Sequence, residues 1–126
     1  MNRNEVNSFI QVYTQLEALY TEIRSLSKKN PNDGINTFKL KYINKTLEEA
    51  NNILKEERKP FSDFTFFEED NLPTNSDVTM IIGQYLGCME ELRSANIEEQ
   101  LENEWFWLVA GKISQLRTSP PKKLRR

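Results

Sequence analysis

The chain has 126 residues, with 17 Lys and Arg against 19 Asp and Glu, and its length fits a single domain. It contains no histidine, which excludes a Ser-His-Asp triad, a Cys-His pair and a histidine zinc site. A single cysteine, Cys88, excludes an intrachain disulfide and a thiolate-rich metal cluster. Neither common phosphate-binding glycine loop is present, and we expect no cofactor and no bound metal.

Residues 3–28 repeat apolar side chains every three or four positions, which predicts a long amphipathic helix. Asn2 followed three positions later by Glu5 predicts a capping box at its start. The Asn-Pro-Asn-Asp-Gly sequence at 30–34 is strong turn chemistry and ends the segment. The predicted buried stripe comprises Val6, Phe9, Tyr13, Leu16, Tyr20 and Ile23.

Three further segments, residues 37–58, 76–94 and 96–116, carry the same helical spacing of apolar side chains. Asn96 with Glu99 predicts a capping pair at the start of the last of them. Short turns between amphipathic helices favour antiparallel packing. The sequence therefore predicts an all-α, antiparallel four-helix bundle over residues 1–118, followed by a basic, proline-containing tail over residues 119–126.

The connection between the second and third predicted helices, residues 59–75, is long for a bundle loop and rich in phenylalanine. One interpretation is that the connection folds over one end of the bundle and closes the core, because uncovered apolar patches are rare in monomers. The other is that it forms a docking surface for a partner protein. The candidate partner-binding residues here are Phe61, Phe64, Phe66, Phe67, Glu68, Glu69 and Asp70.

Gly83 and Gly87 lie one turn apart on one face of the third predicted helix, where glycine is costly without a packing reason. In an antiparallel hairpin with the fourth helix, we expect Trp105 or Trp107 to cover this strip as a close helix-packing contact. The alternative is that the strip accepts a helix from another chain. The exposed rim around Trp107 is a second candidate partner-binding surface.

Charge divides the chain into an acidic body and a basic end. Residues 1–116 carry 12 basic and 19 acidic side chains, whereas residues 117–126 carry five basic and no acidic ones. We expect the tail either to be solvated or to fold back near Glu68–Asp70. As an alternative function, the tail binds nucleic acid in a salt-sensitive way. The residues for that alternative are Lys122, Lys123, Arg125 and Arg126.

The sequence thus favours a non-enzymatic protein-interaction module, acting as an accessory subunit, an inhibitor of another protein or a self-associating bundle. An acidic body suits a partner that presents a basic surface. A second alternative is a Mg²⁺-dependent all-helical phosphohydrolase using paired carboxylates, but these lie on the flanks of the predicted stripes. We expect a cytoplasmic protein without a membrane span, since the sequence has no signal-like or long apolar segment. The carboxylate pairs are Glu48–Glu49, Glu90–Glu91 and Glu98–Glu99.

Overall fold

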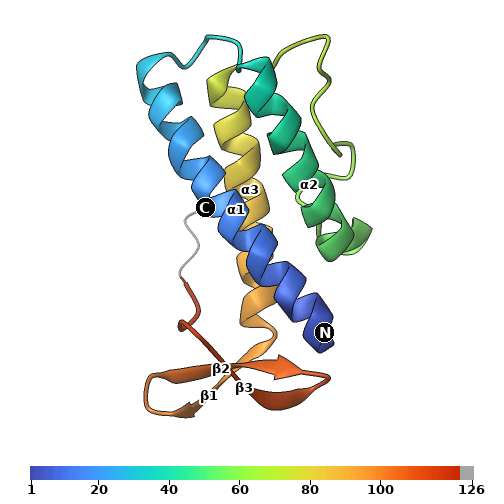
Figure 1. Cartoon of the computed structure of the whole chain (residues 1–126), viewed down its shortest axis with the longest axis vertical. Coiled ribbons are helices and arrows are strands. Elements are labelled where there is room, and N and C mark those ends of the chain that lie inside the picture. The colour runs from blue at the N-terminus through green and yellow to red at the C-terminus, as the bar shows by residue number, and fades with distance from the viewer. Residues whose placement is uncertain (123–126) are drawn as a thin grey trace.

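The computed structural model describes residues 1–122 and shows three helices followed by a three-stranded antiparallel sheet, an α+β fold (Figure 1). The helices lie alongside one another, and the sheet closes the end of the molecule at which α1 begins and α3 ends. Within the described residues, no helix combines the length and the apolar run needed to cross a bilayer. The elements are α1 (Arg3–Lys29), α2 (Thr37–Arg58), α3 (Asn75–Ser94), β1 (Ile97–Leu101), β2 (Glu104–Val109) and β3 (Lys112–Thr118).

The three helices follow the predicted amphipathic pattern. The capping box predicted for α1 is confirmed, because the Asn2 side chain accepts from the Glu5 N–H and the Glu5 carboxylate accepts from the Asn2 N–H. A second capping box joins Thr74 and Asp77 at the start of α3. Each helix contacts both others, and their apolar stripes meet in one core.

The predicted fourth helix is wrong, and with it the all-α four-helix bundle. Residues 97–118 form the meander β1-β2-β3 instead. β2 contains the run Trp-Phe-Trp-Leu-Val, and aromatic and β-branched side chains favour strands over helices. Two-residue loops join the strands, and the second has Ala110 and Gly111 with φ of 52° and 76°, as a type I′ hairpin turn requires. Gly111, expected inside a helix, is therefore a turn residue.

The sheet alternates its side chains between two faces, and the inner face packs on the helices. Trp107 is only 2% exposed, and its ring meets that of Phe9 edge to face with centroids 5.2 Å apart. The Ala110 N–H also donates to the Met1 carbonyl, which ties the β2–β3 turn to the start of the chain. The inner-face residues in contact with the core are Ile97, Trp105, Trp107, Val109 and Leu116.

Replacing Trp107 by Ala should lower the free energy of unfolding by about 3–5 kcal/mol, because it leaves a cavity between the sheet and α1. Urea denaturation followed by far-UV circular dichroism measures the change. The exposed Phe38→Ala is the matched control and should change stability by no more than about 0.5 kcal/mol. Equal loss in both variants would show that the sheet does not depend on this indole.

Candidate functional site

The four phenylalanines of the α2–α3 connection divide into two anchored and two exposed rings. Phe64 and Phe67 pack against the core and meet edge to face at 5.0 Å between centroids. Phe64 also approaches the ring of Tyr85 on α3. Phe61 is exposed, and Phe66 is 58% exposed. The segment thus covers part of the core with two of its rings and leaves the other two in solvent, and the docking interpretation stays a prediction.

Side chains of α2 hold the backbone on either side of Phe66. The Asn44 amide donates to the Phe67 carbonyl at 2.8 Å and accepts from the Phe67 N–H at 2.9 Å. The Asn51 amide donates to the Thr65 carbonyl at 2.8 Å and accepts from the Tyr85 hydroxyl at 2.6 Å. Lys59 donates to the Phe64 carbonyl. The stretch from Phe64 to Phe67 is therefore tied to α2 and to its C-cap, and Phe66 projects from a fixed backbone.

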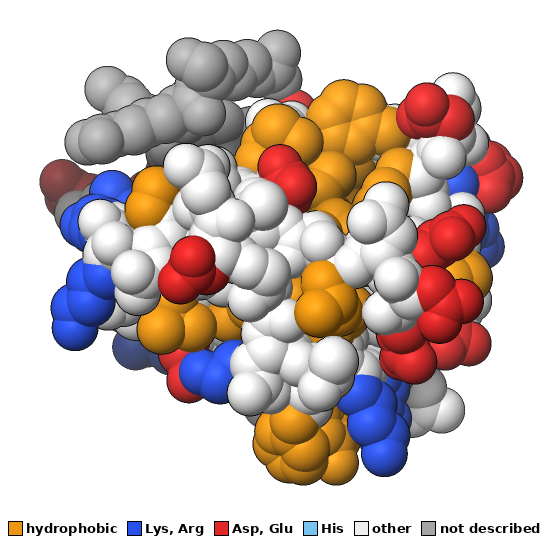
Figure 2. Space-filling model, turned by 90° about the horizontal axis from the view of Figure 1, so that it is seen from above, with side chains coloured by type: hydrophobic (Ala, Val, Ile, Leu, Met, Phe, Trp, Pro, Cys, Tyr) orange, Lys and Arg blue, Asp and Glu red, His pale blue; other side chains and the backbone are white. Residues whose placement is uncertain are grey.

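Acidic side chains follow directly after the anchored segment. Glu68, Glu69 and Asp70 are all exposed. Figure 2 shows acidic side chains gathered on the right of the molecule, the side on which Figure 1 places the connection, with hydrophobic groups between them. Across a surface groove, the same segment faces Lys41 and Lys45 of α2. The connection thus combines exposed aromatic rings with an acidic edge.

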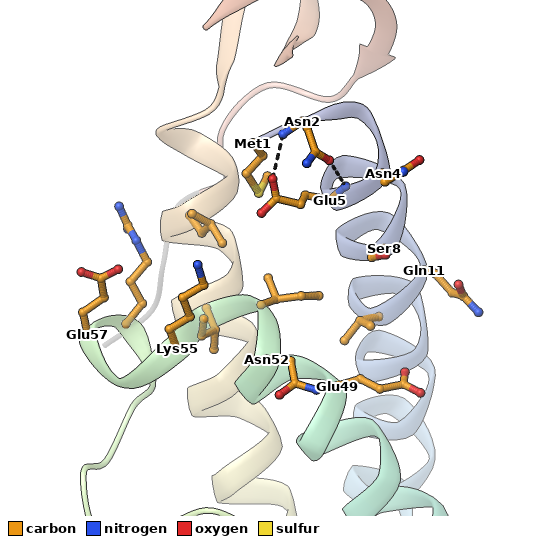
Figure 3. Close-up of a pocket in the computed structure, with 15 residues that line it drawn as sticks. Met1, Asn2, Asn4, Glu5, Ser8, Gln11, Glu49, Asn52, Lys55 and Glu57 are labelled. Carbon is orange, nitrogen blue, oxygen red and sulfur yellow. Dashed lines mark hydrogen bonds between the residues drawn. The ribbon is translucent and has the colours of Figure 1, made fainter. Parts of the chain in front are cut away.

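A second pocket, of about 630 Å³, lies between the start of α1 and the end of α2, and of the candidate functional residues named from the sequence it includes only Glu49 (Figure 3). Its floor is apolar and includes Val12 and Leu54. Lys55 at its rim has φ 60° and ψ 179°, a conformation that breaks α2 before its last turn. Figure 3 shows Gln11 and Glu57 pointing to opposite sides, so the polar groups do not converge on one point as a catalytic site requires.

A buried ion pair within α3 is hydrogen-bonded to the C-terminal segment. Glu90 and Arg93 are 2% and 4% exposed, and the Arg93 Nε and one terminal nitrogen donate to the two Glu90 carboxylate oxygens at 2.7 and 2.8 Å. The Tyr13 hydroxyl and the Lys122 N–H also donate to Glu90. Arg93 donates in addition to the Thr118 hydroxyl and to two carbonyls beyond it. Sequence reasoning missed this network, which the (i, i+3) spacing of Glu90 and Arg93 could have suggested.

The network shifts two pKa values. Burial acts to raise the pKa of Glu90, but hydrogen bonds from Arg93, the Lys122 N–H and Tyr13, together with the Arg93 charge, outweigh it and hold the pKa below its ordinary value. Burial and the negative charges of Glu90 and Glu17 raise the pKa of the Tyr13 hydroxyl. Glu90 is thus held as a carboxylate and Tyr13 as a neutral donor to it.

The part of the basic tail that the structure describes, residues 119–122, lies against α1 and α3. Lys122 forms an ion pair with Glu17 at 3.3 Å, and its ammonium lies 5.1 Å from the centre of the Tyr13 ring. Residues 119–122 therefore contact α1 and α3 rather than Glu68–Asp70. Lys123, Arg125 and Arg126 of the nucleic-acid alternative lie outside the described residues.

The tryptophans do not cover the glycine strip. The space beside Gly83 is occupied by Tyr20 of α1, whose ring would lie 3.3 Å from an added Cβ, and nothing lies within 4 Å of a Cβ at Gly87. Trp105 and Trp107 instead belong to the inner face of the sheet, so the expected exposed rim at Trp107 is wrong. Among the described residues, no group of three or more acidic or cysteine side chains is arranged to hold a metal ion.

Replacing Glu90 by Gln should lower the free energy of unfolding at neutral pH by about 3–5 kcal/mol, because it leaves Arg93 buried without its counter-charge. The pKa of Glu90 is lower in the folded than in the unfolded chain, so the folded chain binds the proton less tightly. Its stabilising contribution is therefore present above the unfolded-state pKa of about 4.3 and is lost as pH falls through the folded-state pKa.

Urea denaturation between pH 7 and pH about 3 tests both effects. The wild-type chain should lose more stability on acidification than Glu90→Gln. The control Glu57→Gln, at an exposed position, should behave like the wild type. Parallel pH profiles for wild type and Glu90→Gln would contradict the assignment.

Comparison with known proteins gives no relative from which a role could be transferred. The chain matches no protein-family model, no curated protein and no solved structure. The functional argument therefore depends on the geometry of its own residues.

Proposed function

We propose that this chain is a non-enzymatic protein-interaction module that binds a basic protein surface through its α2–α3 connection. The docking surface consists of Phe61, Phe66, Glu68, Glu69 and Asp70. The observation that carries the proposal is that Phe66 is exposed while the backbone on both sides of it is fixed by Asn44 and Asn51.

This arrangement favours binding because the loop is already ordered in the free chain, so little conformational entropy is lost when a partner binds. Association normally loses free energy as loops and side chains become fixed, and a preorganised segment loses less. Large aromatic side chains are common among the few residues that dominate binding energy. A ring held in water by hydrogen-bonded neighbours therefore supports a docking role more strongly than exposure alone.

The charge next to Phe66 indicates the kind of partner. Glu68, Glu69 and Asp70 give one edge of the surface a negative potential, which speeds encounter with a basic protein and disfavours acidic partners. Lys41 and Lys45 limit the acidic region on the α2 side of the groove. The expected partner thus places an apolar pocket over Phe66 and basic side chains beyond it, over residues 68–70.

The proposal assigns no catalytic step. It includes a reducing compartment such as the cytoplasm, because a chain with one cysteine needs no intrachain disulfide. Trp107 is not part of it, because its indole is buried. The nucleic-acid alternative depends on the tail, in which Lys122 is already paired with Glu17.

A display library of peptides with and without basic residues, panned on the pure chain, should return sequences that combine an apolar residue with Lys or Arg. Phe66→Ser should weaken the best binder by about thirtyfold, as expected for the loss of a dominant contact of about 2 kcal/mol. Titration calorimetry measures the affinity. Phe38→Ser, a matched exposed phenylalanine on α2, should leave it unchanged.

Two results would contradict the proposal. One is equal affinity for the wild type and Phe66→Ser. The other is the absence of peptide binding at Phe66 together with salt-sensitive binding of a DNA or RNA duplex. If removal of residues 122–126 abolishes that duplex binding, the result favours the nucleic-acid alternative.

A further inference from the structure

The centre of the outer face of the sheet is apolar, although no helix of the described chain covers it. Phe106 and Leu108 of β2 point away from the inner-face tryptophans, and Ile113 lies opposite Leu108 on β3. None of these three side chains belongs to the core cluster, and Ile113 is exposed. Figure 1 shows the helices on one side of the sheet and none of the described chain beyond the other.

β2 has the composition of a strand that is covered on both faces. An antiparallel strand with one wet face normally alternates apolar and polar side chains. All five residues from Trp105 to Val109 are apolar, so both faces of the central strand are suited to burial. The inner face is buried against the helices, whereas on the outer face Phe106 and Leu108 are only half-buried and Ile113 is exposed.

The charges around this face are arranged as a self-complementary pattern. Register places Glu98 of β1, Phe106 of β2 and Arg117 of β3 side by side in one row across the sheet. The Arg117 guanidinium lies 5.7 Å from the centre of the Phe106 ring and pairs with Glu104, yet its side chain remains 68% exposed. One flank of the row is therefore acidic and the other basic.

We infer that the outer sheet face, formed by Phe106, Leu108 and Ile113, binds a second copy of this chain. Two sheets can stack face to face at about 10 Å, with their strands within about 30° of one another. A two-fold axis along β2 places β1 of one copy over β3 of the other, so that each Glu98 faces the partner's Arg117. The other in-plane two-fold would place Glu98 over Glu98, and these two carboxylates have no cation beside them. The axis along β2 brings the two copies of Glu104 together, but each of these is paired with the Arg117 of its own chain.

The contact is separate from the docking surface at Phe66, so the two proposals stand or fall independently. In sedimentation analysis the wild-type chain should form a particle of twice the 14.9 kDa chain mass. Ile113→Lys should weaken the dimer by about tenfold or more, since it buries an ammonium between the sheets. Met80→Lys, at an exposed apolar position on α3, and Phe66→Ser should leave the dimer unchanged.

A charge-swap pair tests the stacking geometry itself. Glu98→Lys alone sets an ammonium against the guanidinium of Arg117, and Arg117→Glu alone sets a second carboxylate against Glu98, so each variant should be monomeric. In an equal mixture both contacts become attractive, and a heterodimer should form. Each variant should keep the wild-type circular dichroism spectrum, since both positions are exposed.

Three outcomes would overturn the inference. The wild-type chain could stay monomeric throughout the micromolar range, or Ile113→Lys could dimerise as well as the wild type. The wild type could also form open-ended oligomers, which would indicate pairing of the exposed β1 and β3 edges instead of stacked faces.

Discussion

The buried pair of Glu90 and Arg93 is the interaction on which the arrangement of the C-terminal third depends. Taking two charges out of water costs several kcal/mol each, and the cost is recovered only when the remaining hydrogen-bonding positions are filled. Here they are filled from α1 by Tyr13 and from the C-terminal segment by Thr118, Ser119, Pro120 and Lys122. Within the described residues, no buried side-chain N or O lacks a hydrogen-bond partner. The pair thus fixes how the end of β3 lies against the helices more than it adds to stability.

The same principle, a polar side chain that satisfies backbone groups, also organises the α2–α3 connection. Asn44 and Asn51 on α2 bond to the connection as an adjacent strand would, and the hydroxyl of Tyr85 completes the second of these contacts. These hydrogen bonds hold the loop against α2, and only Phe64 and Phe67 of its four rings pack on the core. Phe61 and Phe66 are left for the surface, where their exposure has no structural use within the described chain.

The sequence allowed the three helices, the capping box of α1 and most of its buried stripe to be predicted, because Val6, Phe9, Leu16 and Ile23 lie at helical spacing. The sheet was missed because Ile97, Leu101, Trp105 and Leu108 also lie at helical spacing. The decisive signals were the unbroken apolar run of β2 and the Ala110–Gly111 turn. In the candidate site, the phenylalanines and acids were found from composition. Their division into anchored and exposed rings could not be, because it depends on Asn44, Asn51 and Tyr85, which are distant in sequence.

The hydrogen bonds of Arg93 have a consequence for synthesis on the ribosome. Three of its hydrogen-bond acceptors belong to Thr118, Ser119 and Pro120, which the ribosome adds 25 to 27 residues after Arg93. While those residues are still inside the exit tunnel, α3 carries a guanidinium that is ready for burial but incompletely bonded. The last turn of α3 can therefore reach its final hydrogen-bonded state only after the end of β3 has left the tunnel.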